Sequence, residues 1–440
     1  MKSWLARFAY GLLLRLLTPA YLLRLWWRGR REPLYRQAIG ERLGFGPAAP
    51  PGRLWLHAVS LGETRAAAAL VDAMRARQPG LRLLLTHGTA TGRAAGAALL
   101  RDGDVQRWLP WDTPGAVRRF LRRQRPAIGV LMETEIWPNL LHAAQAEGVP
   151  MVLANARLSE KSLAKGERLA ALMRPAAQAV NRVLAQTEAD AQRLRQAGGR
   201  SVVVCGNLKF DVNPNAGLLA HGRGWRERLA RPVVLAAVTR EGEELPLLQH
   251  WKTLAAPRPL LLLVPRHPQR FDEVAALVAD AGLRLQRRSA WAMQPPDEAL
   301  QADVWLGDSM GEMPLYYAAA DVALLGGSFG RFGGQNLIEA AACGCPVVMG
   351  PHTFNFSEAA ELSLAAGAAL RVADIGDGVA RAVALAVDPL RDDWVRRALA
   401  FAAAHRGAAE RMAQEILDLA GSRLNGAQRP SGDARPPDAG

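Results

Sequence analysis

Cysteine is scarce in this chain of 440 residues, and its scarcity excludes whole classes of protein. Three cysteines, at positions 205, 343 and 345, cannot form the paired framework of a small secreted domain. Cys343 and Cys345 are too close in sequence for a standard zinc knuckle, and no set of Cys or His partners lies nearby in the sequence. We therefore expect a reducing compartment and no structural zinc.

Several catalytic signatures are also missing from the sequence. It contains no Walker A sequence, no HExxH and no GxGxxG dinucleotide fingerprint, and the last absence disfavours a dehydrogenase. Asp102 and Asp104 resemble a metal-holding Asp-x-Asp pair, but a DGD sequence flanked by arginines is more typical of a turn. We predict no metal site and no bound cofactor.

The composition is that of a globular protein with an unevenly placed charge. Hydrophobic residues make up 50% and charged residues 22%, and the length favours two domains over one. The formal net charge is +14, and residues 1–45 contribute half of it, with nine Lys or Arg against two Glu. Because this excess flanks an apolar segment, it indicates an anionic lipid surface before a nucleic acid.

The apolar segment covers residues 4–27. One helical stripe of it is apolar, and the arginines spread over the opposite half; the stripe consists of Leu5, Ala9, Leu12, Leu16, Leu23 and Trp27. An arginine in mid-membrane would be costly and Pro19 would kink a helix. We predict a helix or kinked pair in the interface of the cytoplasmic leaflet, with a single-pass anchor or an ordinary core helix as alternatives; a cleaved signal peptide is disfavoured.

The rest of the chain alternates short apolar runs with helical patterns, which predicts parallel sheets. The expected strands are 54–57, 81–85, 128–132, 149–153, 202–205, 233–237, 260–264, 305–307, 322–325 and 346–349. Polar clusters follow these strands, as they do at the ligand-binding edge of open α/β sheets. We predict an α/β protein of two Rossmann-like domains facing each other across a cleft.

The domain boundaries follow from these patterns. We predict a membrane-associated segment at 1–45 and two Rossmann-like domains at 46–215 and 225–390. Helices at 391–424 are expected to pack back across the cleft, and the Pro/Gly-rich residues 425–440 to be disordered.

A glycine-rich loop at residues 326–334 joins the strand at 322–325 to a helix expected at 336–342. Glycines allow close backbone approach to a ligand, and the first N–H groups of the helix favour an anion such as phosphate. Glu339 lies one turn after Asn336, where a carboxylate can accept hydrogen bonds from ribose hydroxyls. The loop therefore indicates a nucleotide or nucleotide-sugar, and the alternative is a tight turn followed by a solvated glutamate.

Three further positions are candidates for chemistry. Glu63, near the start of a helix after the first strand, is either a general base or a partner of the helix dipole. Arg266 and His267 end a strand beside prolines and predict a phosphate contact. Residues 310–312 follow Asp308, which is a plausible helix cap. These residues can bind a base or ribose through backbone and apolar contacts.

Seven sequence segments, in order, carry a resemblance to a known family. They are HAVSLGE, ETEIWPN, GNLKFD, PRHPQRF, GDSMGEM, GGSFGRFGGQNLIEAA and PVVMGPHTFNF. The chain resembles the bacterial 3-deoxy-D-manno-octulosonic acid (Kdo) transferases of lipopolysaccharide synthesis over residues 4–424. The resemblance implies a GT-B fold, a CMP-Kdo donor and a lipid A precursor as acceptor. It also implies that residues 46–215 form the acceptor domain and residues 225–390 the donor domain. It also implies a place at the cytoplasmic face of the inner membrane and no nucleic-acid partner.

By the same resemblance, Glu63 is the catalytic base of an inverting transfer, and Glu133 and Lys209 stabilise the transition state. The residues implied in binding CMP are Pro265, Arg266, His267, Met310, Gly311, Glu312, Gly333, Gly334, Asn336, Leu337, Ile338 and Glu339. Lys209 and Arg266 can neutralise the leaving phosphate. CMP is a good leaving group, so that a metal is not required to hold a diphosphate.

Two positions depart from the family pattern, since Arg240 and Gln335 stand where histidines are usual. Whether these two residues contact the donor substrate is therefore an open question. Two other classes of function also stay open. Another GT-B envelope enzyme, a UDP-sugar transferase or an epimerase, would share the fold and the glycine loop. A non-catalytic protein that binds lipid or nucleic acid would account for the charge and the N-terminal segment.

Overall fold

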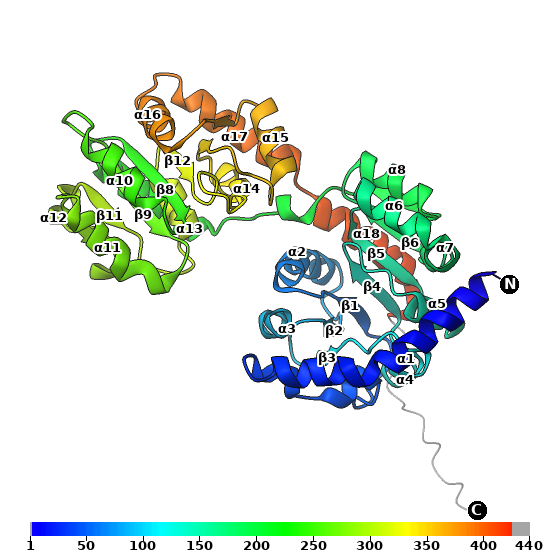
Figure 1. The fold of residues 1–440 in the computed structure, drawn as a ribbon. Coiled ribbons are helices and arrows are strands. Elements are labelled where there is room, and N and C mark those ends of the chain that lie inside the picture. The colour runs from blue at the N-terminus through cyan, green and yellow to red at the C-terminus, as the bar shows by residue number, and fades with distance from the viewer. Residues whose placement is uncertain (1, 425–440) are drawn as a thin grey trace, which may run out of the picture. The chain divides into compact units, whose positions relative to one another are not determined.

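The structure is a computed structural model that describes residues 2–424, so the prediction for residues 425–440 lies outside the described residues. The chain forms two compact units. Of the described residues, unit 1 contains 2–211 and 407–424, and unit 2 contains Val212–Arg406. The chain therefore leaves unit 1 once and returns to it near the C-terminus (Figure 1).

Unit 1 is built on a parallel seven-stranded sheet in the order β3-β2-β1-β4-β5-β6-β7. Its strands are β1 (Leu54–His57), β2 (Leu83–His87), β3 (Val105–Trp108), β4 (Ile128–Met132), β5 (Met151–Ala156), β6 (Arg182–Ala185) and β7 (Val202–Val204). The strand order reverses at β1, which pairs with β2 on one side and β4 on the other. Such a reversal leaves room at the carboxyl ends of the two strands, where ligands bind in open α/β sheets.

Helices cover both faces of this sheet. They are α2 (Leu61–Arg77), α3 (Ala90–Gly96), α4 (Pro114–Gln124), α5 (Pro138–Ala146), α6 (Glu160–Arg168), α7 (Ala170–Gln178), α8 (Glu188–Gln196) and α18 (Ala408–Ala420). Leu54 and Leu56 pack with α2 and α18 on one face, whereas Trp55 packs with α4 on the other. This alternation along β1 is the period of two expected of a strand buried on both faces.

Unit 2 repeats the design with the order β10-β11-β9-β8-β12-β13-β14. Its strands are β8 (Val233–Thr239), β9 (Leu260–Pro265), β10 (Leu285–Arg287), β11 (Val304–Leu306), β12 (Val322–Leu325), β13 (Val347–Met349) and β14 (Ala369–Arg371). Its helices are α9 (Ala216–Arg228), α10 (Glu244–Lys252), α11 (Phe271–Asp280), α12 (Asp297–Leu300), α13 (Met313–Ala319), α14 (Leu337–Ala342), α15 (Ser357–Ala365), α16 (Ile375–Ala386) and α17 (Arg391–Ala404). The order reverses at β8, between β9 and β12.

The α/β class is confirmed, but each sheet has seven strands where the sequence predicted five. The four missed strands are β3, β6, β10 and β14. Three of them lie at a sheet edge, where only one side is paired, and their sequences VQRW, LQR and ALR mix polar with apolar residues. A short polar edge strand has no continuous apolar run by which it can be recognised.

The N-terminal segment is one helix, α1 (Lys2–Arg28), with Pro19 inside it. All six residues of the predicted apolar stripe are exposed, whereas Gly11, Leu14 and Leu25 are buried. Tyr10 donates a hydrogen bond of 3.0 Å to the Asp112 carboxylate, which ties the helix to unit 1. The helix therefore docks through one face and leaves its apolar stripe uncovered. Within residues 2–424 it is also the one helix long and apolar enough to cross a membrane.

Candidate functional site

The reversal of strand order in unit 1 places Glu63 beside the carboxyl end of β1. Ser60 caps α2 by accepting a hydrogen bond from the Glu63 N–H, and the Ser60 hydroxyl donates to Glu63 Oε1 at 3.1 Å. The N–H of Val59 donates to Oε2 at 2.8 Å. This arrangement is a variant of the capping box, in which the Glu63 carboxylate accepts the N–H of the residue before the cap, and it fixes the orientation of that carboxylate.

The pKa of Glu63 is raised above its ordinary value, chiefly because the carboxyl is partly buried. The charge of Glu133 raises it further, while the hydrogen bonds from Val59 and Ser60 oppose the increase. A carboxylate with a raised pKa holds a proton more readily, as a general base must during transfer. Glu63 therefore combines a capping role with the properties of a base.

Glu133 follows β4, the strand next to β1, and its backbone has φ of 57°. This left-handed conformation is uncommon for residues other than glycine and is often found at functional sites. Arg157, which follows β5, forms an ion pair of 3.2 Å with the Glu133 carboxylate. The pairing neutralises one of the negative charges at this edge of the sheet.

Glu135 is a third carboxylate at the same edge, and the sequence analysis assigned it no role. It accepts a hydrogen bond of 2.7 Å from the Trp137 indole. Burial raises the pKa of Glu135 to about 7, and the charges of Glu63 and Glu133 add to the effect. The only signal in the sequence was the pair of carboxylates in ETEIWPN. Their shared environment is a tertiary property.

Lys209 lies in a short helix, η4 (Leu208–Phe210), which contacts α2. The Asn207 side chain accepts the Lys209 N–H at 3.0 Å, and Asn155 at the end of β5 accepts the Leu208 N–H at 3.0 Å. The structure thus brings Glu63, Glu133 and Lys209, which the sequence selected from three separate motifs, to one edge of one sheet.

In unit 2, Glu243 organises the glycine-rich loop. Its buried carboxylate accepts hydrogen bonds from the N–H groups of Gly327 at 2.7 Å, Phe329 at 3.2 Å and Gly330 at 3.0 Å. It also accepts the N–H of Arg240 at 2.8 Å. One side chain therefore fixes the loops after β8 and β12, the strands at which this sheet reverses its order.

The two departures from the family pattern lie close together at this loop. Gly327 has φ of 70°, and a Cβ atom there would lie 3.1 Å from Gln335 Nε2 and 3.4 Å from Arg240 Cγ. The Arg240 guanidinium stacks 4.6 Å from the centre of the Phe332 ring, a cation–π contact. Arg240 and Gln335, the two departures from the family pattern, are therefore far apart in the sequence but lie beside the same glycine.

The strand β9 ends at Pro265 and is followed by Arg266 and His267. The N–H of Arg266 donates to the Thr239 carbonyl at 2.9 Å, which joins this turn to the end of β8. Partial burial lowers the pKa of His267, and the charges of Arg240 and Arg266 lower it further. Positive charge is therefore concentrated at the carboxyl ends of β8 and β9, where it favours an anion.

The run of Met310, Gly311 and Glu312 precedes α13. Met310 is 72% exposed, and Glu312 accepts a hydrogen bond of 2.8 Å from Arg288. The prediction that Asp308 caps this helix is wrong, because Glu312 occupies the cap position. Asp308 instead accepts hydrogen bonds from Arg287 and Ser289 on the neighbouring β10 side.

The end of the glycine loop also holds predicted donor residues. Gly333 and Gly334 have φ of 88° and 77°, which favours glycine at both positions. Asn336 is the residue before α14, not its first residue as predicted, and its side chain accepts the Ile338 N–H at 3.1 Å.

The remaining residues predicted to bind CMP differ in burial, and therefore in which of their atoms can contact a ligand. The side chains of Leu337 and Ile338 are buried, so only their backbone atoms remain available. Glu339 is partly buried, and this burial raises its pKa. Across residues 2–424, no three His, Cys, Asp or Glu side chains are arranged to hold a metal ion.

Comparison with known proteins places these features in a family. A family model described as 3-deoxy-D-manno-octulosonic-acid transferase (kdotransferase) matches residues 37–212. The chain is 49% identical to the 3-deoxy-D-manno-octulosonic acid transferase of Bordetella pertussis over 95% of this chain and 100% of that protein. It is 36% identical to the enzyme of the same name from Haemophilus influenzae, over 86% of this chain and 90% of that protein.

Solved structures support the fold. A glycosyltransferase of kitacinnamycin superposes with a TM-score of 0.51 and 19% identity, covering 83% of this chain and 98% of that one. Two parallel seven-stranded sheets in separate units, together with this likeness, establish the GT-B fold. The identity to the Bordetella pertussis enzyme extends over nearly the whole chain, and the chain therefore belongs to the 3-deoxy-D-manno-octulosonic acid (Kdo) transferase family of glycosyltransferases.

Proposed function

We propose that this protein transfers Kdo from CMP-Kdo to a lipid A precursor, with inversion at the anomeric carbon and Glu63 as the general base. The observation that carries the proposal is the position of Glu63 at the reversal of strand order, with a fixed carboxylate and a raised pKa. Family membership supports Kdo as the transferred group, because the relatives are named for its transfer. CMP-Kdo as the donor and a lipid A precursor as the acceptor are the substrates that the sequence resemblance implies.

The chemistry needs one base and a stabilised leaving group. The Glu63 carboxylate takes the proton of the acceptor hydroxyl while that oxygen bonds to the anomeric carbon of Kdo. The bond from this carbon to the phosphate oxygen breaks, and CMP leaves with the electron pair. Because attack and departure occur on opposite faces, the configuration inverts. A base of this kind typically contributes a factor of about 10² to 10⁴ in rate.

The charged residues around these sheet edges suit the remaining steps. Glu133 is the second carboxylate beside Glu63, and its pairing with Arg157 holds it in place. Lys209 supplies positive charge at the same sheet edge of unit 1, and Arg266 supplies positive charge among the residues of unit 2 that are proposed to bind CMP. In unit 2, His267, residues 310–312 and the glycine loop would hold CMP. Cationic side chains can neutralise a single phosphate, so the proposal assigns no metal.

The exposed stripe of α1 is proposed to lie on the anionic cytoplasmic face of the inner membrane. It presents Leu16 at 71%, Leu23 at 67% and Trp27 at 66% exposure. Apolar side chains of this kind enter the interface, while neighbouring arginines attract anionic headgroups. The helix would thus keep the enzyme where a lipid acceptor is found.

Mass spectrometry of a lipid A precursor incubated with CMP-Kdo tests the function. Wild-type protein should add the mass of one or more Kdo units, and the number of additions gives the size of the product. Glu63→Gln should lower the rate at least a hundredfold, because an amide cannot take the proton. Glu188→Gln is the matched control, since Glu188 also lies in the first turn of a helix of unit 1 and is exposed.

The outcomes separate the parts of the proposal. No mass gain with folded wild-type protein would reject CMP-Kdo as the donor and lead to UDP-sugars as the next donors to test. Full activity of Glu63→Gln would reject the base and leave the transfer intact.

A further inference from the structure

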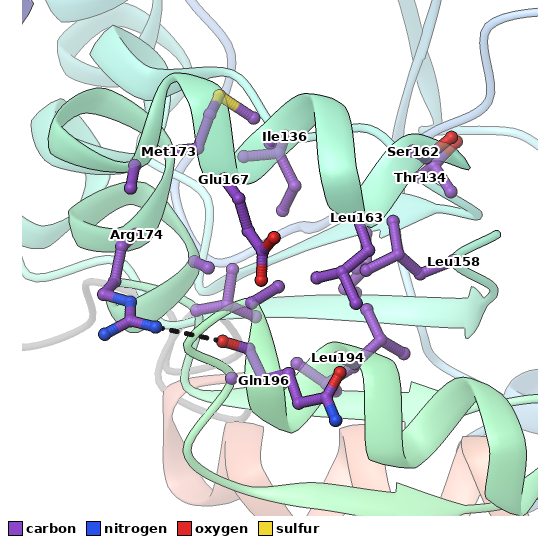
Figure 2. Close-up of a pocket in the computed structure, with 18 of the residues that line it drawn as sticks. Thr134, Ile136, Leu158, Ser162, Leu163, Glu167, Met173, Arg174, Leu194 and Gln196 are labelled. Atoms are coloured by element: carbon purple, nitrogen blue, oxygen red, sulfur yellow. Dashed lines mark hydrogen bonds between the residues drawn. The ribbon is translucent and has the colours of Figure 1, made fainter. Parts of the chain in front are cut away.

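An apolar cavity of ≈ 110 Å³ lies in unit 1, beside the residues assigned above to the transfer (Figure 2). Its walls come from β5, β6, α6, α7 and α8, and they include Leu153, Leu163, Met173, Val183 and Leu194. We call it the α6 cavity. Its apolar interior offers no set of partners for a nucleotide base or a sugar, and it suits a hydrocarbon group.

The helix α6 covers this cavity without filling it. None of its nine residues is buried, although the helix lies over an apolar floor. Gly166 lines the cavity from α6, and a Cβ atom there would meet nothing within 4 Å. Well-packed proteins rarely leave apolar space of this kind, because unfilled cavities reduce stability. An apolar ligand would complete the packing of α6.

Two of the residues that line the cavity adjoin the glutamates of the proposed active site. Thr134, which stands between Glu133 and Glu135 in the sequence, lines the cavity, and so does Arg157. The same Arg157 forms the 3.2 Å ion pair with Glu133. A chain held in the cavity would therefore continue toward the carboxylates that act on the acceptor.

The charged lining residues favour an anionic headgroup outside the cavity. They are Arg157, Arg174 and one acid, Glu167, all of them exposed. Arg174 donates a hydrogen bond of 3.2 Å to the Gln196 carbonyl, drawn as a dashed line in Figure 2. Because Arg157 is paired with Glu133, Arg174 is the cation of this rim that can attract the phosphate of a lipid whose chain enters the apolar interior.

We propose that the α6 cavity binds the end of one hydrocarbon chain of the acceptor and thereby selects acylated acceptors. This inference rests on the proposed function. An apolar cavity of about 150 Å³ is enough to bind benzene, so this one has room for a short segment of a single chain. Each methylene group that it buries should strengthen binding about fourfold.

The test compares Gly166→Leu, which fills the cavity, with Ala164→Leu on the same helix. Ala164 is exposed and does not line the cavity, so it is the matched control. Leucine is favoured over glycine in a helix, so Gly166→Leu should fold. The measurement is kcat/KM for the lipid A precursor and for its deacylated form. Gly166→Leu should lower the ratio of the two values at least tenfold, whereas Ala164→Leu should leave it unchanged.

A binding measurement gives a second readout that does not require turnover. Calorimetric titration of the full-length protein with dodecyl phosphate should give an affinity that Gly166→Leu weakens at least tenfold. Butyl phosphate, which has the same headgroup, should bind weakly to both proteins.

The possible results separate the inference from the proposed function. An unchanged acceptor ratio in Gly166→Leu would overturn the inference, as would an equal loss on both acceptors or equal affinity for dodecyl phosphate. Absence of transfer by wild type to either acceptor would instead reject the proposed function, and the dodecyl phosphate titration would still decide whether the cavity binds a chain.

Discussion

The carboxylate of Glu243 accepts a hydrogen bond of 2.7 Å from the N–H of Gly327, which lies 84 positions further along the chain. Two more N–H groups of the glycine-rich loop share this carboxylate. In many phosphate-binding loops the backbone N–H groups point at the ligand. Here part of the loop is held instead by a buried acid, so its shape is fixed before any donor binds.

Replacing Glu243 with alanine should therefore loosen the glycine loop. A buried N–H group without a partner costs roughly 1–3 kcal/mol, so Glu243→Ala should lower the free energy of unfolding by several kcal/mol. Urea unfolding measures this change, and hydrogen exchange of the loop localises it. Glu241→Ala is the control, because Glu241 is exposed two positions earlier. Equal stability of the two variants would contradict the role of Glu243.

Glu135 should make stability depend on pH in a defined direction. Its folded pKa of about 7 exceeds its ordinary value of 4.5, so between these values the folded state holds a proton that the unfolded state has lost. Stability should therefore fall as pH rises from about 4.5 to 7. Glu135→Gln should remove this loss and be more stable than wild type at pH 8, by at most about 3 kcal/mol at about 1.4 kcal/mol for each pKa unit.

Chemical unfolding of both proteins at pH 4 and pH 8 checks this expectation for Glu135. The difference should be small at pH 4, where the carboxyl is protonated in both states. The Trp137 hydrogen bond can persist, since the glutamine oxygen still accepts it. A difference that is the same at both pH values would contradict the raised pKa.

The exposed stripe of α1 should control membrane association. Leu16→Glu combined with Leu23→Glu should weaken binding to anionic vesicles at least tenfold, because burying each leucine contributes about 1.5–3 kcal/mol. Sedimentation with vesicles measures the effect. These positions are preferable to deletion of the helix, because Leu14 and Leu25 pack against unit 1 and their removal would destabilise it.

Leu245→Glu is the matched control for the α1 substitutions, since Leu245 is 50% exposed on α10 of unit 2. It should sediment with vesicles as wild type does. If all three proteins sediment equally, the stripe does not bind the membrane.

The sequence alone was sufficient to identify the two-sheet α/β architecture and the family, and it predicted which edges of the sheets bind ligands. Long apolar runs such as those of β8 and β9 are visible locally, because burial on both faces of a parallel sheet requires them. Glu63 and the glycine loop were also visible, since each is marked by its place after a strand. The short edge strands were not visible in the sequence, because each pairs with only one neighbouring strand and its residues show no periodic pattern.

How these residues influence one another depends on the folded structure. The ion pair of Glu133 with Arg157, the pKa of Glu135 and the meeting of Arg240 with Gln335 at Gly327 all join separate motifs. The α6 cavity likewise exists only where five elements leave space between them. The burial of a side chain and its interactions with other charges depend on which residues surround it in space. The order of residues in the sequence does not show these neighbours, because folding brings them together.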